Sequence, residues 1–171
     1  MKTRSVTLRK KKIQFKPIGI IHSPFKKIVG IPIQTVFSNK GNGTVELLPE
    51  YKEGLKDLKG FSHIILIYYF HRSKGCRLIC RPFLDKVERG VFATRAPARP
   101  NPIGLSIVRV KKIRGNMIKV ASLDILDGTP LIDIKPYIPQ FDAPRVLKGG
   151  WLEKAYKNKE GMTKSDGRFT L

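Results

Sequence analysis

The sequence predicts a mainly β fold: a small closed or nearly closed β-barrel with one or two short helices. Its length of 171 residues suits a single domain. Six or seven apolar stretches of strand length are separated by frequent turn signals, which is typical of barrels. There is one strong helical pattern, and no Gly-rich loop leads from a strand into a helix, so the fold is not Rossmann.

The first two predicted strands flank a turn. The stretch from Ile13 to Ile21 predicts a strand interrupted at Pro17, because proline lacks a backbone donor. A short strand from Thr44 to Leu48 follows Gly41-Asn42-Gly43. A phosphate-binding glycine loop opens a helix, whereas a strand follows here, so this tripeptide predicts a simple turn.

The middle of the chain carries the clearest helix and the most apolar strand. Pro49 suits the first helical position and Gly60 the position after the end, which predicts a helix from Pro49 to Lys59. The continuous apolar run from His63 to Phe70 has strand length. It predicts a strand that is buried on both faces.

The remaining elements complete the predicted barrel. Further strands are expected over Arg89–Thr94, Ile103–Ile113, Met117–Leu123 and Leu131–Ile134. Arg114-Gly115-Asn116 predicts the hairpin turn between the second and third of these, and Pro136 ends the last. Trp151 to Tyr156 predicts a short packed helix. We expect a basic tail over 1–12, the barrel domain over 13–142 and a C-terminal extension over 143–171.

Charge indicates the class of partner. Lysine and arginine number 34 against 13 acidic residues, a formal net charge of +21. Such a chain attracts polyanions, and nucleic acid is the favoured partner because binding releases counterions. General solubility, or adaptation to a hot or salty cell, is the alternative. Without a signal peptide or an apolar span we expect a cytoplasmic protein with no membrane partner.

The two cysteines do not indicate a metal site. Cys76 and Cys80 lie four residues apart, and no His or Cys cluster supplies the further ligands that zinc requires. In a cytosolic chain such thiols stay reduced and have structural roles. We therefore expect no bound metal.

A proline-rich loop carries the first candidate functional residues. Three prolines within six residues, from Pro97 to Pro102, fix several φ angles and make the loop stiff. Arg95 and Arg99 stand on this loop, and guanidinium groups on a rigid support suit the binding of carboxylate or phosphate. The alternative is a structural corner whose arginines meet only solvent.

Two further segments carry candidate polar residues. Asp124 and Asp127 lie just before a turn, where they could accept hydrogen bonds from ribose hydroxyls or balance a cation, or simply form the turn. His71 and Arg72 follow the most apolar strand and could line a pocket, although a lone histidine is more often structural. We call the loop that carries Arg95 and Arg99 the arginine loop, and the turn that carries Asp124 and Asp127 the aspartate turn. We expect the two to converge on one pocket at the barrel mouth.

Several of these motifs together resemble one family. The stretches Ile18–Lys26, Ile31–Gln34, Phe61–His63, Gly90–Gly104, Asp124–Pro130 and Asp133–Tyr137 are similar to the TrmO (TsaA-like) family of S-adenosylmethionine-dependent tRNA methyltransferases. The similarity extends from about Phe15 to Asp142. Two features depart from the family pattern: Pro97 and Ala98 differ within the arginine loop, and the Asp-Pro-Arg-Pro motif of bacterial members is missing.

The resemblance implies a function and a set of contacts. It implies a barrel that binds S-adenosylmethionine without a Rossmann domain, acts as a homodimer, and methylates N6 of threonylcarbamoyladenosine beside the tRNA anticodon. The implied cofactor contacts are Pro32, Ile33, Gln34, His71, Arg72, Arg95, Leu105, Asp124, Ile125, Leu126 and Asp127.

The expected mechanism is direct displacement at the sulfonium methyl group, in which positioning matters more than a strong base. Arg95 is expected to bind an anionic group of the cofactor or substrate, and Arg99 to contact the substrate. The catalytic base is not identified. A non-enzymatic RNA-binding barrel that binds S-adenosylmethionine, and a small-molecule methyltransferase, are the alternatives.

Overall fold

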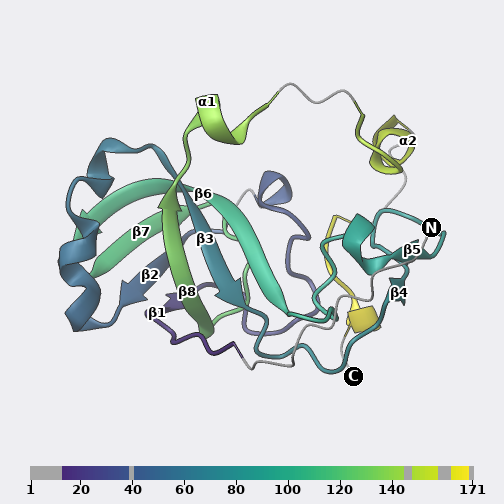
Figure 1. Cartoon of the computed structure of the whole chain (residues 1–171), viewed down its shortest axis with the longest axis horizontal. Coiled ribbons are helices and arrows are strands. Elements are labelled where there is room, and N and C mark those ends of the chain that lie inside the picture. The colour runs from purple at the N-terminus through teal and green to yellow at the C-terminus, as the bar shows by residue number, and fades with distance from the viewer. Residues whose placement is uncertain (1–12, 39–40, 145–147, 158–162, 170–171) are drawn as a thin grey trace, which may run out of the picture.

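The chain folds around a closed, six-stranded antiparallel barrel (Figure 1). The computed structural model describes residues 13–38, 41–144, 148–157 and 163–169. The barrel strands follow the order β1-β2-β7-β6-β3-β8, and β8 pairs with β1 to close the ring. They are β1 (Gly19–His22), β2 (Gly43–Leu47), β3 (His63–Tyr69), β6 (Ile103–Arg114), β7 (Met117–Ala121) and β8 (Thr129–Pro136). The predicted fold class is confirmed.

The helices and the second sheet are short. A two-stranded sheet pairs β4 (Ile79–Cys80) with β5 (Arg89–Gly90) beside one end of the barrel (Figure 1). The helical elements are the α-helices α1 (Pro139–Asp142) and α2 (Leu152–Lys157), and the 3-10 helices η1 (Thr35–Phe37), η2 (Pro49–Leu55), η3 (Leu58–Gly60), η4 (Val91–Ala93) and η5 (Gly167–Phe169). No helix among the described residues has the length and apolar character that crossing a membrane requires.

The barrel interior is an apolar core formed by alternate strand residues. Side chains that point inward are almost fully buried, because successive strand residues face opposite sides of the sheet. The core consists of Ile21, Val45, Leu47, Leu55, Ile64, Leu66, Tyr68, Val108, Ile118, Val120, Leu123, Ile125 and Leu131. The β6–β7 hairpin turns at Gly115, whose φ of 60° favours glycine, as the sequence predicts.

A smaller apolar cluster lies outside the barrel, around the β4–β5 sheet. It consists of Cys80, Val91, Ala96, Ala98 and Phe169, with Phe83 packed against it. The Phe83 and Phe169 rings meet edge to face, with centroids 5.1 Å apart. This cluster joins the arginine loop to the C-terminal segment, by which we mean residues 148–157 and 163–169.

The predicted central helix is wrong in type and length. The segment forms two short 3-10 helices, η2 and η3, in place of one α-helix. The helix cannot continue through Asp57, because this residue adopts a left-handed conformation with φ 64°. Leu55 nevertheless packs against the barrel core as the apolar face of the predicted helix requires.

Most predicted strands differ from the structure at their ends, and three of them are shorter than predicted for a clear reason. The first begins only at Gly19, two residues after Pro17, which cannot donate to a ladder. The stretch Arg89–Thr94 gives only the two residues of β5 before η4 begins. The strand from Met117 stops at Ala121, because Ser122 has a left-handed φ of 63°.

The prediction that β3 is buried on both faces is wrong. Ile64, Leu66 and Tyr68 face the interior and are at most 4% exposed, whereas Tyr69 on the outer face is 43% exposed. In a closed barrel only one face of each strand meets the core. The basic tail over 1–12 and part of the predicted extension lie outside the described residues. A strand does follow Gly41-Asn42, as expected for a turn.

Candidate functional site

A cavity of about 790 Å³ opens at the barrel end nearest the β4–β5 sheet. It is formed by the end of β3, the start of β6, the loops around Pro32, Phe92 and Asp124, and the C-terminal segment. This volume lies within the range of small-molecule and cofactor sites. Predominantly apolar side chains with a few charged groups line it, as is usual for such sites.

The structure brings almost all of the predicted site residues to this cavity. The residues that line it include Pro32, Ile33, Gln34, His71, Arg72, Arg95, Arg99, Leu105, Asp124, Ile125 and Leu126. Asp127 does not line it. The arginine loop and the turn that carries Asp124 therefore meet at the mouth of the barrel.

The arginine loop is fixed by its own hydrogen bonds. The Thr94 hydroxyl donates to the Val91 carbonyl at 2.9 Å and accepts from the Ala96 N–H at 3.2 Å. The Arg99 guanidinium donates to the Thr94 carbonyl at 3.4 Å. Because Ala98 is buried in the small apolar cluster, the loop is anchored on both sides of its first proline.

Arg95 is oriented by a partner far away in the sequence. Its Nη1 donates to Gln34 Oε1 at 2.9 Å. Gln34 comes just before η1 on the loop that follows β1. This contact aims a fixed cation into the cavity and joins two of the predicted cofactor-binding segments.

Asp124 is the end of a chain of polar side chains that crosses the barrel end. Ser106 Oγ donates to Asp124 Oδ1 at 2.7 Å, and the Tyr68 and Ser106 hydroxyl oxygens are 3.0 Å apart. Burial raises the pKa of the Asp124 carboxyl to about 6, although the Ser106 hydrogen bond and Arg95 oppose this change. Burial and the nearby Asp124 raise the pKa of Tyr68 well above its usual value.

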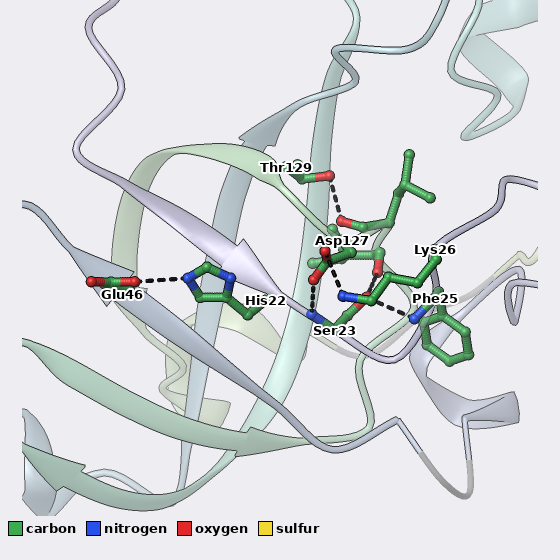
Figure 2. Close-up of polar contacts among 9 residues, drawn as sticks. His22, Ser23, Phe25, Lys26, Glu46, Asp127 and Thr129 are labelled. Carbon is green, nitrogen blue, oxygen red and sulfur yellow. Dashed lines mark hydrogen bonds and ion pairs between the residues drawn. The ribbon is translucent and has the colours of Figure 1, made fainter.

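Asp127 has a different environment three residues further on (Figure 2). Its Oδ1 accepts from the Ser23 N–H at 2.8 Å, and its Oδ2 lies 2.6 Å from Lys26 Nζ. The Lys26 hydrogen bond and the Ser23 N–H lower the pKa of this carboxyl. The Asp127 carboxylate therefore links the turn before β8 to the loop that follows β1, and its predicted contact with a cofactor stays a prediction.

His71 and Arg72 lie where β3 ends, at the cavity rim. Burial and the neighbouring Arg72 lower the pKa of the His71 imidazole. The ring is therefore neutral at physiological pH. Arg72, Arg95 and Arg99 together give the cavity three cationic lining residues.

The C-terminal segment contributes lining residues that the sequence analysis did not assign to a site, although it predicted a short packed helix from Trp151 to Tyr156, where α2 forms. Trp151, Leu152, Ser165, Asp166 and Phe169 all face the cavity. Trp151 Nε1 donates to the Ala93 carbonyl at 2.8 Å, and the Arg89 guanidinium lies 5.8 Å from the centre of its ring. These contacts hold the segment against the arginine loop. The single tryptophan of the chain, Trp151, is the sequence signal that could have indicated this contact with the arginine loop.

Residues 163–169 also hold the loop that carries Pro32, Ile33 and Gln34. Ser165 Oγ accepts from the Ile31 N–H at 2.9 Å and donates to the Ile28 carbonyl at 2.5 Å. The backbone adds bonds from the Gly30 N–H to the Ser165 carbonyl and from the Ser165 N–H to the Ile31 carbonyl, at 2.8 and 2.7 Å. The predicted cofactor loop is thus paired with a segment more than a hundred residues away.

Possible metal ligands are sparse. The described part of the chain contains no group of three or more His, Cys, Asp or Glu side chains that could hold a metal ion. Cys76 is exposed and Cys80 is buried, and both are free thiols.

The chain is an antiparallel β-barrel with a cavity at its mouth that three arginines and two part-buried carboxylates line. Comparison with known proteins identifies the family. The model of the tRNA-methyltransferase O N-terminal domain matches residues 20–143, and the chain belongs to this family. The match contains the barrel strands from β2 to β8 and most of the cavity, and it ends before the C-terminal segment.

Individual relatives agree with this assignment. A Pyrococcus abyssi protein named "Probable S-adenosyl-L-methionine-binding protein" is 54% identical over 157 residues, which cover 92% of this chain and 85% of that one. The Escherichia coli protein named tRNA (adenine(37)-N6)-methyltransferase is 39% identical over 136 residues, 74% of this chain but 58% of its own length. The crystal structure of TrmO from Pseudomonas aeruginosa superposes with a TM-score of 0.70 at 38% identity, and covers 82% of this chain and 62% of that chain.

Proposed function

We propose that this chain is an S-adenosylmethionine-dependent tRNA methyltransferase that acts in the cytoplasm on N6 of threonylcarbamoyladenosine beside the anticodon. The observation that carries the proposal is the convergence of Gln34, Arg95 and Asp124 on one cavity in a chain of this family. The names of the relatives, which refer to S-adenosylmethionine binding and to tRNA adenine methylation, support the same function.

The residues present fit the proposed cofactor. S-adenosylmethionine carries a carboxylate and an adenosine, and the cavity offers the Arg95 guanidinium, the Gln34 amide and apolar surface of suitable volume. When bound, it supplies an activated methyl group. Arg95 would bind the methionine carboxylate or the carboxylate of the threonylcarbamoyl group. Gln34 and nearby backbone groups would hold the adenine or methionine end.

The charge of the cavity rim supports an RNA substrate. Arg72, Arg95 and Arg99 line the opening, and the whole chain carries a net charge of +21. Phosphate contacts make binding depend strongly on salt. Phe92, which lines the cavity and is 78% exposed, offers an aromatic ring that can stack on an unpaired base.

Calorimetry with S-adenosylmethionine, followed by radiolabelled transfer to tRNA with and without threonylcarbamoyladenosine, tests the function. We expect binding, and transfer only to the modified tRNA, with an apparent affinity for tRNA that falls steeply as salt rises. Cofactor binding without transfer would favour the non-enzymatic RNA-binding barrel. Transfer without RNA and without salt dependence would favour a small-molecule methyltransferase.

The Arg95→Ala variant tests the anion-binding role. Loss of a charge-assisted hydrogen bond to a carboxylate is expected to weaken cofactor binding, or to raise the KM for modified tRNA, by about 10-fold or more. Arg109→Ala, a cation on the barrel strand β6 away from the cavity, is the control. Unchanged cofactor affinity and unchanged methylation in Arg95→Ala would contradict the assigned role.

We also propose that the chain acts as a homodimer. The outer faces of β3 and β6 form a continuous apolar surface, because Tyr69, Ile67 and Ile65 pair with Ile103, Leu105 and Ile107. Leu105 is 48% exposed and Ile107 is 37% exposed. A second copy of the chain is the occupant we propose, since isolated soluble chains rarely expose such a patch.

Light scattering coupled to size exclusion tests the homodimer. Wild type is expected to elute as a dimer. Ile107→Lys is expected to elute as a monomer, and Val87→Lys, on an exposed loop apart from this surface, is expected to remain dimeric. A monomeric wild type, or a dimeric Ile107→Lys variant, would contradict this interface.

A further inference from the structure

Methyl transfer to this nitrogen requires a proton acceptor. On the proposed function, the target nitrogen is part of a urea-like group whose lone pair is delocalised. Its N–H proton becomes strongly acidic once a fourth bond forms, and must leave as the methyl group arrives. A positioned side chain that takes such a proton typically accelerates the reaction by about 10²- to 10⁴-fold. The acceptor must face the cavity and must be free of a strong cationic partner.

Few groups that line the cavity can accept a proton. Among the described residues the carboxylates that line it are Asp124 and Asp166. Asp166 is held by the guanidinium of Arg168, whose Nε lies 3.0 Å from both carboxylate oxygens and whose Nη2 lies 2.8 Å from Oδ2. This pairing lowers the pKa of Asp166 and makes it a poor base. Asp124 and the neutral imidazole of His71 remain.

The geometry favours Asp124 over His71. Asp124 is fixed by Ser106, which is itself bonded to Tyr68, and these two residues belong to the paired strands β6 and β3. Asp124 itself lies on the turn before β8, but its carboxylate is hydrogen-bonded to a strand side chain, which holds it more rigidly than a group without such support. His71 instead lies on the turn after β3, beside the cation Arg72.

We propose that Asp124 is the general base of the reaction and that Ser106 and Tyr68 position it. In this step the N6–H bond breaks and its proton passes to the Asp124 carboxylate. The N6 electron pair forms the new N–CH₃ bond while the donor's S–CH₃ bond breaks and its electron pair stays on sulfur. Charge is balanced, because the sulfonium becomes neutral and the carboxylate becomes a carboxylic acid.

The surroundings of Asp124 suit a group that must gain and lose a proton. Burial destabilises the carboxylate, which makes it a better acceptor, while Ser106 and Arg95 keep it ionised at neutral pH. The charged and titratable groups that act on it are Arg95 on the arginine loop and Tyr68 on β3, and His71 lines the same cavity. Tyr68 stays protonated and can donate to Ser106.

The experiment combines single-turnover methylation of modified tRNA, calorimetry and the pH profile, all with the full chain. Asp124→Asn is expected to lower the single-turnover rate constant by about 10²- to 10⁴-fold, while the affinities for S-adenosylmethionine and S-adenosylhomocysteine stay within about threefold. Asp133→Asn, a carboxylate paired with Lys135 on β8, is the matched control and keeps the wild-type rate.

The pH profile separates the base from its positioning residues. The wild-type rate constant is expected to rise through an apparent pKa of about 6 and then level off. Ser106→Ala removes a hydrogen bond that lowers the pKa of Asp124, so the acidic limb moves to higher pH. Asp124→Asn loses this limb. A carbon-13 label on the aspartate carboxyls gives the same titration by nuclear magnetic resonance, independently of activity.

Four outcomes would overturn the assignment. An Asp124→Asn variant with the wild-type rate and acidic limb contradicts it while leaving the proposed function intact, as does loss of the limb in His71→Asn alone. If Asp124→Asn weakens binding of S-adenosylmethionine much more than that of neutral S-adenosylhomocysteine, and the rate at saturation is normal, Asp124 balances the sulfonium charge instead. A wild-type chain that binds cofactor and transfers no methyl group contradicts both this assignment and the proposed function.

Discussion

The barrel and the C-terminal segment are held in place by different kinds of contact. Inside the barrel, apolar side chains from six strands pack around one core, and almost every one is completely buried. The C-terminal segment has one deeply buried apolar side chain, Phe169, and depends on individual hydrogen bonds from Ser165 and Trp151. The first region is stabilised by collective packing, and the second by single contacts that one substitution can remove.

This difference separates stability from ligand binding. The barrel should set the global free energy of unfolding, because it contains most of the buried apolar surface. The C-terminal segment should affect mainly the cavity that it lines, since it contacts the loops and not the barrel core. Four substitutions test this difference between the two regions.

Leu66→Ala is expected to have the largest effect. Leu66 is completely buried at the centre of β3, and removing its side chain leaves a cavity in the core. We expect the free energy of unfolding to fall by about 2–5 kcal/mol in denaturant titrations. The cooperative transition should be retained. A loss below 1 kcal/mol would show that the barrel does not depend on this packing.

Phe169→Ala is expected to open the C-terminal segment without unfolding the barrel. It removes the ring that packs on Phe83 and closes the small apolar cluster. We expect local stability to fall by up to about 3 kcal/mol. Hydrogen exchange should accelerate at the Ile31 and Ile33 amides, which bond to this segment, and stay slow at Leu66. Equal acceleration at both places would remove the distinction between the regions.

Ser165→Ala is expected to weaken cofactor binding with little change in global stability. It removes the acceptor of the Ile31 N–H and the donor to the Ile28 carbonyl, at a local cost of about 1–2 kcal/mol. Calorimetry should show a several-fold weaker affinity for S-adenosylmethionine. Ser62→Ala, whose hydroxyl contacts only an exposed histidine ring, is the control. The same affinity in both variants would mean that the loop does not need this support.

Asp127→Asn is expected to have the smallest effect. It weakens an ion pair with Lys26 and a hydrogen bond from Ser23 at a partly exposed turn, about 1 kcal/mol or less. The pKa of Asp127 is lowered in the folded chain, so this stabilisation is present above the unfolded value of about 3.9 and is lost as pH falls through the folded value. The two proteins should therefore become equally stable in acid.

The same variant tests the predicted role of Asp127 in binding. A turn-forming role predicts an unchanged affinity for S-adenosylmethionine at neutral pH. A large loss of affinity would show instead that Asp127 contacts the cofactor, as the resemblance implies. Thermal unfolding curves at several pH values and calorimetry together separate these outcomes.

The barrel could be predicted because its signals are local. Alternating apolar residues, a glycine hairpin turn and the lack of a strand-to-helix glycine loop are all visible in the sequence. The errors arise where local sequence signals do not determine the structure. The β3 run looks buried on both faces because its outer residues are also apolar, and the sequence does not say which surface another subunit or a ligand covers. The left-handed conformations of Asp57 and Ser122, which end their elements early, have no recognisable pattern in the sequence.

The site could be predicted in part. The arginine loop and the aspartate turn were identified by residue type and motif, but Asp124 and Asp127 look equivalent in the sequence. Which carboxylate reaches the cavity depends on Lys26 and Ser23, more than a hundred residues away. The contribution of residues 163–169 was missed because it rests largely on backbone hydrogen bonds, which most residues can make.

The closure of the barrel restricts how a macromolecule can be recognised. In an open sheet the outermost strand offers unpaired backbone groups, to which an extended peptide can add as a new strand. Here the backbone groups of β1 and β8 pair with each other, so the six-stranded ring has no unpaired edge strand. A partner that contacts the ring must be selected by side chains and connecting loops, and a change of specificity can therefore arise there while the ring itself stays the same.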